Sequence, residues 1–472
     1  DYSGSRGLGD VYKRQSAGRV QSVALRIISE RELEIEKFNP QEYWSIQGHF
    51  LNKDDKDINA RLTLFDGNKI DKLDIKDEKQ ASKIYETIKK SNFNVGNITK
   101  KEAKRNPYPA FTTSTMQIES SRKLGLSASQ TMRTAQKLYE GTEIDGETTG
   151  LITYMRTDSV VMSNEAINQV RSFVVESYGN EYLPDTPRVY KSKAKNAQEA
   201  HECIRPTNVN LTPKNIKQYI TGDEYKLYEI IWQRAVSSQM ASAILDQVAI
   251  DITSEDKQVS LRANGSTIKF PGMYKVYQEA KDDDKDEEKE TILPVMNEGE
   301  KLNLKEVIKN QHFTMPPPRY TEASLVKKLE ELGIGRPSTY ASIIKVLQDR
   351  DYVILDKKRF NPHDRGRIVS IFLEKYFNQY VEYDFTADLE NQLDEISDGK
   401  LDWKEVLRNF WETFKQLCDD TVGKSNREVI DVLDDALGTH FFPPEGKDES
   451  RKCPTCENGR LGIKVGKFGG FI

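Results

Sequence analysis

The sequence predicts a mixed α/β protein built from several domains. Its 472 residues, 36% of them hydrophobic, are enough for roughly two to four domains with buried cores. Two stretches, 43–108 and 246–312, contain short runs that alternate apolar and polar residues, as β-strands do. The block between them, 109–245, mixes helical and strand patterns, and 313–440 is mainly helical. The simplest arrangement is a β arch in two halves, with the mixed domain inserted at its end.

Residues 16–42 are expected to form a helical segment. Ser16 is a suitable N-cap, and a helix to about Lys37 places five apolar side chains on one face (Val20, Val23, Ala24, Ile27 and Ile28). Asn39-Pro40 ends it, because the residue before a proline disfavours helical geometry. Residues 1–15 show no clear periodicity. We interpret them as a non-native leader and exclude them from the fold.

The arch is expected to consist of strands and hairpins. Over 43–93, runs such as 60–65 are followed by turn residues, here Asp66-Gly67. Short β-type runs return at 247–276. Between the later runs lies the acidic segment 281–290, with three positive and seven negative side chains, which we interpret as a loop.

Three helices are expected in the inserted domain. Ser114 opens the first with a capping-box pattern and Gly125 ends it. Ser127 opens the second in the same way and Gly141 ends it. A third helix starts after Ser163 and ends near Gly179, with a buried stripe of Ile167, Val170, Phe173 and Val174.

The segment 313–440 resembles a winged helix-turn-helix in its order of elements. Thr321 caps a helix that Gly333 ends, Ser338 caps the next, and 352–371 carries a hairpin. Ordinary helix packing is the alternative reading of the same pattern.

Ten residues, Gly150 to Ser159, carry the strongest chemical signal. Their β-type run predicts an extended strand, in which Tyr154 and Arg156, two apart, share a face. A phenol beside a fixed cation suits attack on a phosphodiester, with the phenol as nucleophile and the guanidinium stabilising charge on the phosphate. Thr153 and Asp158 are short polar neighbours able to orient either group. A buried strand with an exposed end is the plainer alternative.

This decapeptide resembles the active-site strand of bacterial DNA topoisomerase I, of the type IA family. Met155 favours topoisomerase I over topoisomerase III, where proline would be expected. Four further stretches match motifs of the family in the same order: 16–22 (SAGRVQS), 111–115 (FTTST), 200–207 (AHECIRPT) and 333–341 (GIGRPSTYA). The resemblance therefore covers most of the chain and implies the arch-shaped fold of that family.

The resemblance implies a reaction and its residues. The residue matching Tyr154 attacks a DNA phosphate and becomes linked to the 5′ end, Arg156 supports it, and His201 contacts the same phosphate region. The whole protein would relax negatively supercoiled DNA by cleaving one strand, passing the other and religating. Because one phosphodiester replaces another, no ATP is needed. The sequence agrees, since it contains no G-x-x-x-x-G-K-[ST] loop.

The resemblance also implies contacts to single-stranded DNA from residues near helix starts, where unpaired N–H groups favour anions. The candidates are Ser16, Arg19, Gln21, Arg336, Ser338 and Thr339. Helix capping alone is the alternative role for the hydroxyl residues among them.

The family needs Mg²⁺, held by a D-x-D-x-E cluster in a domain that would precede Ser16 and that we expect to be missing. A literal match at 284–288 lies inside the acidic segment, and we attribute it to composition. Residues 441–472 are expected to begin a truncated zinc ribbon, with Cys453 and Cys456 at zinc-ligand spacing. A structural zinc site requires four ligands. We therefore expect the pair Cys453 and Cys456 alone to bind Zn²⁺ weakly or not at all.

Composition bounds the remaining possibilities. No run of about 18 apolar residues exists, so no membrane association is expected. Four cysteines in a chain of this size fit a reducing cytoplasm. The net charge of −5 is not typical of a nucleic-acid-binding protein, but contacts to phosphates require only local positive charge. We expect a monomer that acts on DNA. The alternatives are a non-enzymatic winged-helix DNA-binding or scaffold protein, and topoisomerase III.

Overall fold

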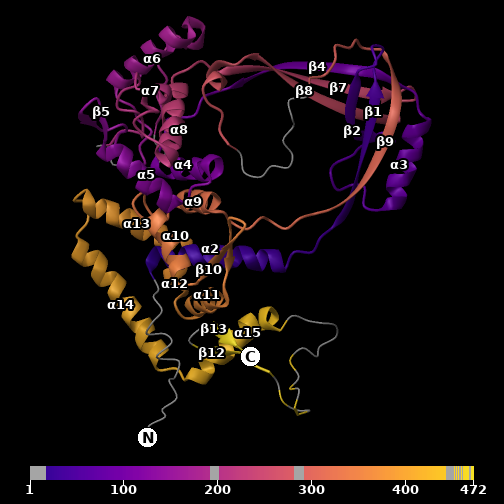
Figure 1. Cartoon of the computed structure of the whole chain (residues 1–472). Helices are drawn as coiled ribbons and strands as arrows, with labels where there is room; N and C mark the ends of the chain where they lie inside the picture. Colours follow the sequence, from indigo (N-terminus) through magenta and orange to yellow (C-terminus); the bar gives the residue numbers. More distant parts are fainter. Residues whose placement is uncertain are drawn as a thin grey trace.

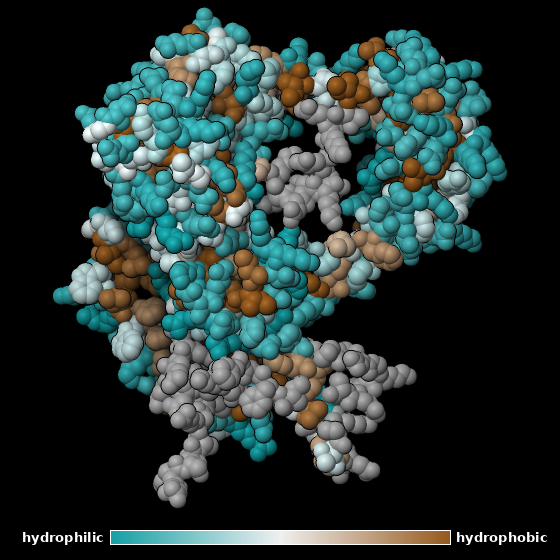
Figure 2. All heavy atoms as spheres, in the orientation of Figure 1, coloured by the Kyte–Doolittle hydropathy of each residue, from teal (hydrophilic) through white to brown (hydrophobic). Residues whose placement is uncertain are grey.

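The computed structural model describes residues 18–191, 201–280 and 292–442, and, towards the C-terminus, 451, 453, 455, 456, 459, 461–466 and 469–471. The predictions for Ser16, the leader 1–15 and the acidic segment 281–290 lie outside these residues. Three parts surround a central opening (Figures 1 and 2). They are a β barrel, a domain that carries Tyr154, and a helical domain.

The β arch is an antiparallel sheet that closes on itself. The strand order is β1-β9-β4-β7-β8-β2-β3, and the additional pairing of β1 with β2 closes six of the strands into a ring. Apolar side chains such as Phe50, Phe93 and Ile252 fill its interior. The strands are β1 (Glu42–Leu51), β2 (Asp57–Phe65), β3 (Asn68–Lys69), β4 (Phe93–Arg105), β7 (Ala243–Ser254), β8 (Val259–Phe270) and β9 (Lys301–Phe313).

The expectation of strands and hairpins throughout 43–93 is wrong over one stretch, where the chain forms helix α3 (Glu78–Lys90) on the barrel. The Asp77 carboxylate accepts a hydrogen bond from the Gln80 N–H at 2.8 Å, as an N-cap does. The helix buries Ala81, Ile84 and Ile88, which recur at helical spacing. That spacing is the signal the β-type reading overlooked.

The tyrosine domain, residues 106–242, is inserted between β4 and β7, whose ends pair Arg105 with Ala243. Its core surrounds the central helix α8, in which Leu227, Tyr228 and Ile231 are fully buried. Its elements are α4 (Thr113–Glu119), the π-helix η1 (Ser120–Leu124), α5 (Ala128–Glu140), β5 (Thr142–Ile144), β6 (Glu147–Thr149), α6 (Asn164–Tyr178), the 3₁₀ turn η2 (Asn180–Tyr182), α7 (Pro213–Ile216) and α8 (Gly222–Ser238), with the 3₁₀ turn η3 (Gly272–Lys275) following β8.

The expected start and stop signals of this domain hold with one correction. Ser127 caps α5, Gly141 ends it, and α6 lies between Ser163 and Gly179. The N-cap of α4, however, is Thr112 rather than Ser114, and its capping-box partner is Thr115. The Thr112–Thr115 pair has the same spacing as the predicted box, so the sequence pattern alone could not fix the register.

The helical domain combines α2 with the chain that follows β9. Val23, Leu25 and Ile28 of α2 share one core with α9, α10 and α11, so the ranges 16–42 and 313–440 contribute to one unit. The elements are α2 (Arg19–Glu36), α9 (Glu322–Glu331), α10 (Tyr340–Asp349), β10 (Val353–Asp356), β11 (Arg359–Pro362), α11 (Asp364–Tyr376), α12 (Asn378–Val381), α13 (Tyr383–Ser397), α14 (Trp403–Val422), α15 (Asn426–Phe441), β12 (Lys464–Gly466) and β13 (Gly469–Phe471).

Three boundaries in the helical domain differ from expectation. The helix α2 begins at Arg19, and its N-cap is Gly18. The N-cap of α10 is Thr339 rather than Ser338. The hairpin predicted for 352–371 ends at Pro362, and α11 follows. The helix–turn–helix–hairpin order of α9, α10, β10 and β11 is present as expected. No helix among the described residues has both the length and the apolarity needed to cross a bilayer.

Candidate functional site

The tyrosine loop, residues 150–159, is not the strand that the sequence predicts. Its only ladder contact among the described residues is an isolated bridge between Ile152 and Pro206, and the chain bends at Thr153, Met155 and Arg156. The backbone groups of this segment are instead hydrogen-bonded to two other parts of the domain. Because the bends break the alternation of a strand, the one-face argument for Tyr154 and Arg156 does not apply.

The first of these supports comes from the 111–115 motif. The buried Thr113 hydroxyl donates to the Met155 carbonyl at 2.7 Å and accepts from the Thr157 N–H at 2.9 Å. The Thr113 N–H also donates to the Thr157 carbonyl at 2.9 Å. These bonds fix the loop on both sides of Arg156.

The second support comes from the 200–207 motif. The Thr153 N–H donates to the Arg205 carbonyl at 2.9 Å, and the Thr207 N–H donates to the Leu151 carbonyl at 3.0 Å. The Thr153 hydroxyl donates to the Cys203 carbonyl at 2.7 Å and accepts from the Arg205 N–H at 3.0 Å. The structure therefore uses Thr153 to join two segments. Three sequence motifs that are distant along the chain meet at one loop.

The Tyr154 ring lies between two other rings. The His201 ring is tilted at 42° to it with centroids 5.3 Å apart, and the Tyr139 ring meets it edge-on at 5.4 Å. Tyr154 is half-buried, whereas Arg156 is exposed. Neither the Tyr154 hydroxyl nor Arg156 forms a hydrogen bond or ion pair with any residue that the structure describes. The predicted neighbours Tyr154 and His201 are thus brought together, with the phenol and the guanidinium both available to a ligand.

Tyr139 was not predicted from the sequence. It lies in the last turn of α5, two residues before Gly141, and its side chain is 41% exposed. Its carbonyl carbon and oxygen also approach Gly150, where an added Cβ would lie 2.9 Å from the oxygen. A tyrosine near the end of a helix carries no local signal of this kind, because only the fold brings it to the tyrosine loop.

Asp158, in the tyrosine loop, is influenced by charges of the helical domain. Burial raises the pKa of its carboxyl above the ordinary value, although a backbone hydrogen bond and the nearby Arg336 and His201 oppose this effect. Asp394 on α13 adds to the increase. Asp158 therefore belongs to a group of charges that reaches from the nucleophile to α13.

Cys203 is fully buried, and burial raises the pKa of its thiol to about 12. A thiol in that state is a poor nucleophile. This agrees with the sequence reading, which gave Cys203 no catalytic role.

The predicted DNA-binding residues on the helical domain also converge. Arg19 at the start of α2 and Arg336 in the turn before α10 both pair with Glu390 of α13. The Arg336 side chain also binds Asp394 at 2.6 Å, and the Thr339 hydroxyl accepts from the Arg336 N–H at 2.9 Å. Ser338 is exposed, and the side chain of Gln21 folds over Gly18. The carboxylates on α13 were not predicted, since their pairing with Arg19 and Arg336 is entirely tertiary.

The tyrosine domain contacts the helical domain through two glutamates of α9. The Ser114 hydroxyl donates to Glu330 at 2.6 Å, and the Ala128 N–H donates to Glu322 at 2.6 Å. Burial raises the pKa of both glutamates, and Asp158 raises that of Glu330 further. Ser114, predicted from the sequence to open a helix, is therefore part of this interface.

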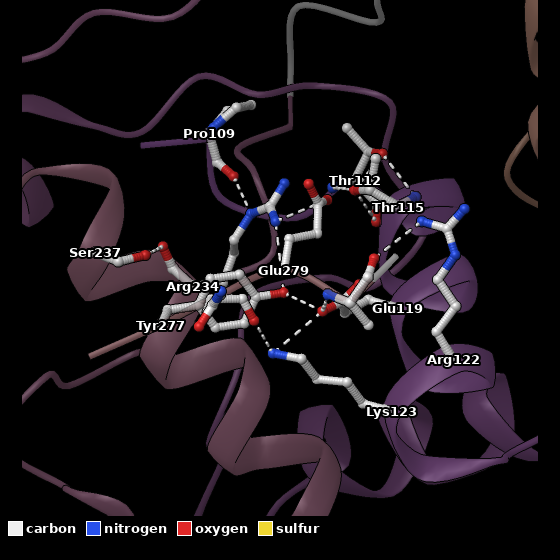
Figure 3. Close-up of polar contacts among 12 residues, drawn as sticks. Pro109, Thr112, Thr115, Glu119, Arg122, Lys123, Arg234, Ser237, Tyr277 and Glu279 are labelled. Carbon is white, nitrogen blue, oxygen red and sulfur yellow. Dashed lines mark hydrogen bonds and ion pairs between the residues drawn. The ribbon is translucent and has the colours of Figure 1, made fainter. Parts of the chain in front are cut away.

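A second polar cluster ties the tyrosine domain to the returning chain (Figure 3). The buried Glu119 carboxylate accepts from the Tyr277 hydroxyl at 2.6 Å and pairs with Lys123 at 3.2 Å. Arg234 of α8 donates to the Pro109 carbonyl at 2.7 Å and pairs with Glu279 at 3.1 Å. These bonds join the tyrosine domain, including its entry at Pro109, to the chain that follows β8, so the cluster is structural.

The Cys453–Cys456 pair forms a knuckle around Gly459. The Thr455 N–H donates to the Cys453 sulfur at 3.4 Å, and such hydrogen bonds lower the pKa of Cys453 to about 7. Both sulfurs approach Gly459, so the thiols point to one side. No group of three or more possible metal ligands occurs among the described residues. His440 is engaged elsewhere, with Asp364 at 3.2 Å and Glu36 at 3.4 Å. The knuckle therefore supplies two ligands, short of a complete zinc site.

A closed β arch with a tyrosine-bearing domain inserted between two of its strands is the fold of a type IA topoisomerase, and comparison with known proteins agrees. A family profile described as DNA topoisomerase matches residues 4–408. A DNA topoisomerase 1 of Rickettsia bellii is 54% identical over 458 residues, which are 97% of this chain and 57% of that protein. One of Zymomonas mobilis is 48% identical over 97% of this chain and 37% of its own length.

A solved structure of full-length topoisomerase I from Thermotoga maritima superposes with a TM-score of 0.76, at 32% identity, over 97% of this chain and 68% of that one. The chain belongs to the type IA DNA topoisomerase family. It spans a little over half the length of its Rickettsia relatives, 57% in the case of R. bellii. These relatives are named DNA topoisomerase 1, which agrees with the expectation from Met155.

Proposed function

We propose that this chain carries the nucleophile and much of the single-strand groove of an ATP-independent enzyme that relaxes negatively supercoiled DNA. One observation supports this above the others. Two separate motifs hold the tyrosine loop, and Tyr154 lies beside His201 while its hydroxyl and Arg156 form no hydrogen bond with a described residue. Such preorganisation places polar groups where charge develops in the reaction.

In the proposed reaction, the Tyr154 hydroxyl oxygen forms a bond to a DNA phosphorus while the bond from phosphorus to the 3′ oxygen breaks. The phenolic proton is transferred, in the net reaction, to the released 3′ hydroxyl. Arg156 stabilises the negative charge on the phosphate, and His201 contacts the same group. Religation is the reverse exchange, so the phosphodiester bond energy is conserved and no nucleotide is consumed.

The arch provides the gate in this proposal. Separation of the tyrosine domain from the helical domain at the Ser114–Glu330 contact would open the ring to the second strand. We propose single-stranded or underwound DNA as the partner, a monomeric state and a cytoplasmic location. For Mg²⁺, which the family uses, the described residues gather no ligand cluster, so we assign no step to it. For Zn²⁺, Cys453 and Cys456 would supply two thiolate ligands.

The test uses a chimera in which this chain replaces the matching 458 residues of the R. bellii protein. It is incubated with a single-stranded oligonucleotide labelled at its 3′ end, so that a 5′-linked adduct retains the label. We expect a denaturant-stable adduct that disappears in Tyr154→Phe. An adduct of unchanged yield in that variant would show that another nucleophile acts. Absence of any adduct would favour a non-enzymatic DNA-binding protein.

The chain by itself is expected to bind a single-stranded oligonucleotide without relaxing supercoiled plasmid efficiently. Gel assays of relaxation with and without Mg²⁺ check this expectation. Robust Mg²⁺-dependent relaxation by the chain alone would contradict it.

A further inference from the structure

The helix α13 brings two carboxylates to the candidate DNA-binding arginines. Glu390 and Asp394, one turn apart, face Arg19 and Arg336, which come from sequence motifs more than 300 residues apart. The surface that we propose to bind phosphates thus also carries two carboxylates.

The two carboxylates differ in how firmly they are held. The Glu390 side chain is 6% exposed and pairs with both arginines, through one oxygen to Arg19 and through the other to Arg336 at 3.3 Å. The Asp394 side chain is 30% exposed and pairs with Arg336, whose side chain is 28% exposed. Removing a partner from a buried ion network costs much more than exchanging a partly exposed one. Of the two carboxylates, Asp394 is therefore the one that another anion can replace on Arg336.

Every nitrogen of the Arg336 guanidinium has an acceptor. One Nη donates to the Gly335 carbonyl at 2.8 Å and to the Gly333 carbonyl at 3.3 Å. The remaining edge, Nε and the other Nη, faces the two oxygens of Asp394 at 3.4 and 2.6 Å. Carboxylate and phosphate bind this edge of an arginine with the same two-pronged geometry. A phosphate that binds Arg336 through this edge must therefore take the place of Asp394.

The position of this pair points to DNA as the source of that phosphate. Asp158 of the tyrosine loop lies within electrostatic reach of Arg336, Asp394 and His201. The Arg336 edge thus lies near Asp158 of the tyrosine loop, where the proposed function places the DNA.

We propose that Asp394 occupies, in the DNA-free protein, the place of one backbone phosphate of the bound strand. Binding exchanges the carboxylate for that phosphate on Arg336, while Glu390 stays between Arg19 and Arg336. No covalent bond changes. The inference rests on the proposed function, because it takes single-stranded DNA as the ligand.

The test measures binding of a fluorescein-labelled oligo(dT) to the whole chain by fluorescence anisotropy over a range of salt concentrations. Asp394→Asn is compared with Asp398→Asn, a control on the same helix whose carboxylate pairs with Lys400 at 2.9 Å. Both variants change the net charge equally. We expect Asp394→Asn to bind roughly threefold more tightly than the control, since a partly exposed ion pair no longer competes. Its salt dependence should keep the log–log slope of the control, because the phosphate contact to Arg336 forms in both complexes.

A double-mutant cycle separates this exchange from a general charge effect. In an Arg336→Ala background, Asp394→Asn should raise affinity no more than Asp398→Asn does. A gain that persists without Arg336, or an Asp394→Asn affinity equal to or below that of the control, would overturn the proposal. Failure of the wild-type chain to bind oligo(dT) would instead contradict the proposed function.

Folding of each variant is checked by circular dichroism and thermal unfolding. If Asp394→Asn does not fold, Asp394→Ser takes its place with the same expected results. Failure of both to fold would show that Asp394 is required by the structure rather than exchangeable, and would also overturn the proposal.

Discussion

The tyrosine loop and the turn before α10 each carry an arginine that we propose to contact DNA, but they hold it by opposite means. In the tyrosine loop, Thr113 and Thr153 bind the backbone, and the Arg156 side chain is exposed. In the turn, the Arg336 side chain itself is bound, by Asp394 and by the carbonyls of residues 333 and 335.

The difference indicates how each region meets its ligand. A loop fixed through its backbone keeps its functional groups in place with little reorganisation, which favours chemistry. An arginine held by a carboxylate of its own must exchange partners, which favours reversible binding of a strand that has to be released. The predictions below test the backbone support of the tyrosine loop, the ring packing beside its phenol, and the contact between the tyrosine domain and the helical domain.

The largest effect is expected from removing the backbone support. Thr113→Val leaves the buried Met155 carbonyl and Thr157 N–H without their side-chain partner. Two unsatisfied buried groups should lower the free energy of unfolding by about 2–4 kcal/mol. Urea denaturation measures this. The control Thr63→Val removes one hydrogen bond, to the Ser260 carbonyl at 3.2 Å, from the barrel and should cost about 0.5–1 kcal/mol. Equal losses in the two variants would contradict the special role of Thr113.

An intermediate effect is expected from Tyr139, which packs edge-on against Tyr154. Such aromatic pairs contribute about 0.5–1.5 kcal/mol, so Tyr139→Ala should slow adduct formation by the chimera roughly threefold to tenfold. Tyr139→Phe keeps the ring and should retain the wild-type rate. Single-turnover cleavage of the labelled oligonucleotide gives both rates.

Tyr85→Ala serves as the control for this comparison, because Tyr85 lies on α3, on the barrel. A Tyr139→Ala rate equal to that of Tyr85→Ala would show that the edge-on contact does not position the nucleophile. A loss in Tyr139→Phe as large as in Tyr139→Ala would assign the effect to the hydroxyl group rather than to ring packing.

The smallest effect is expected at the interface between the tyrosine domain and the helical domain, where a substitution should increase stability rather than reduce it. Burial raises the pKa of Glu330, so the folded protein favours its protonated form, and ionisation at neutral pH costs stability. Glu330→Gln should therefore stabilise the chain by about 0.5 kcal/mol at pH 7. The gain should vanish as the pH falls below the ordinary glutamate pKa of 4.5, where the carboxyl is protonated in folded and unfolded chains alike.

Thermal unfolding of both proteins between pH 4 and pH 8 measures this difference. Glu331→Gln is the control, because Glu331 is the next residue of α9 but pairs with Lys327 at 4.0 Å instead of contacting Ser114, and it should show no such pH dependence. A Glu330→Gln variant that is less stable than wild type at pH 7 would show that the Ser114 contact requires the ionised carboxylate.

Sequence reasoning could propose the reactive residues because the motifs that contain them are short stretches of chain. Tyr154, Arg156 and His201 were assigned from short stretches, and the Tyr154 and His201 rings do meet in the structure. Helix boundaries with a clear cap and a terminal glycine, such as Ser127 with Gly141, were also predicted correctly. The strand at 150–159 was not, because a β-type composition describes a preference for extended backbone and not whether a partner strand lies beside it.

The amino-acid sequence by itself determined the class of fold and the family and led to the proposal of Tyr154 as the nucleophile, since periodicity, capping and motif residues act within a few turns of chain. Only the tertiary structure decided that Thr113 and Thr153 anchor the loop, that Tyr139 flanks the phenol and that α13 supplies carboxylates to Arg19 and Arg336. These contacts join residues far apart in the chain, and their energies depend on burial and on donor–acceptor geometry, which no local pattern specifies.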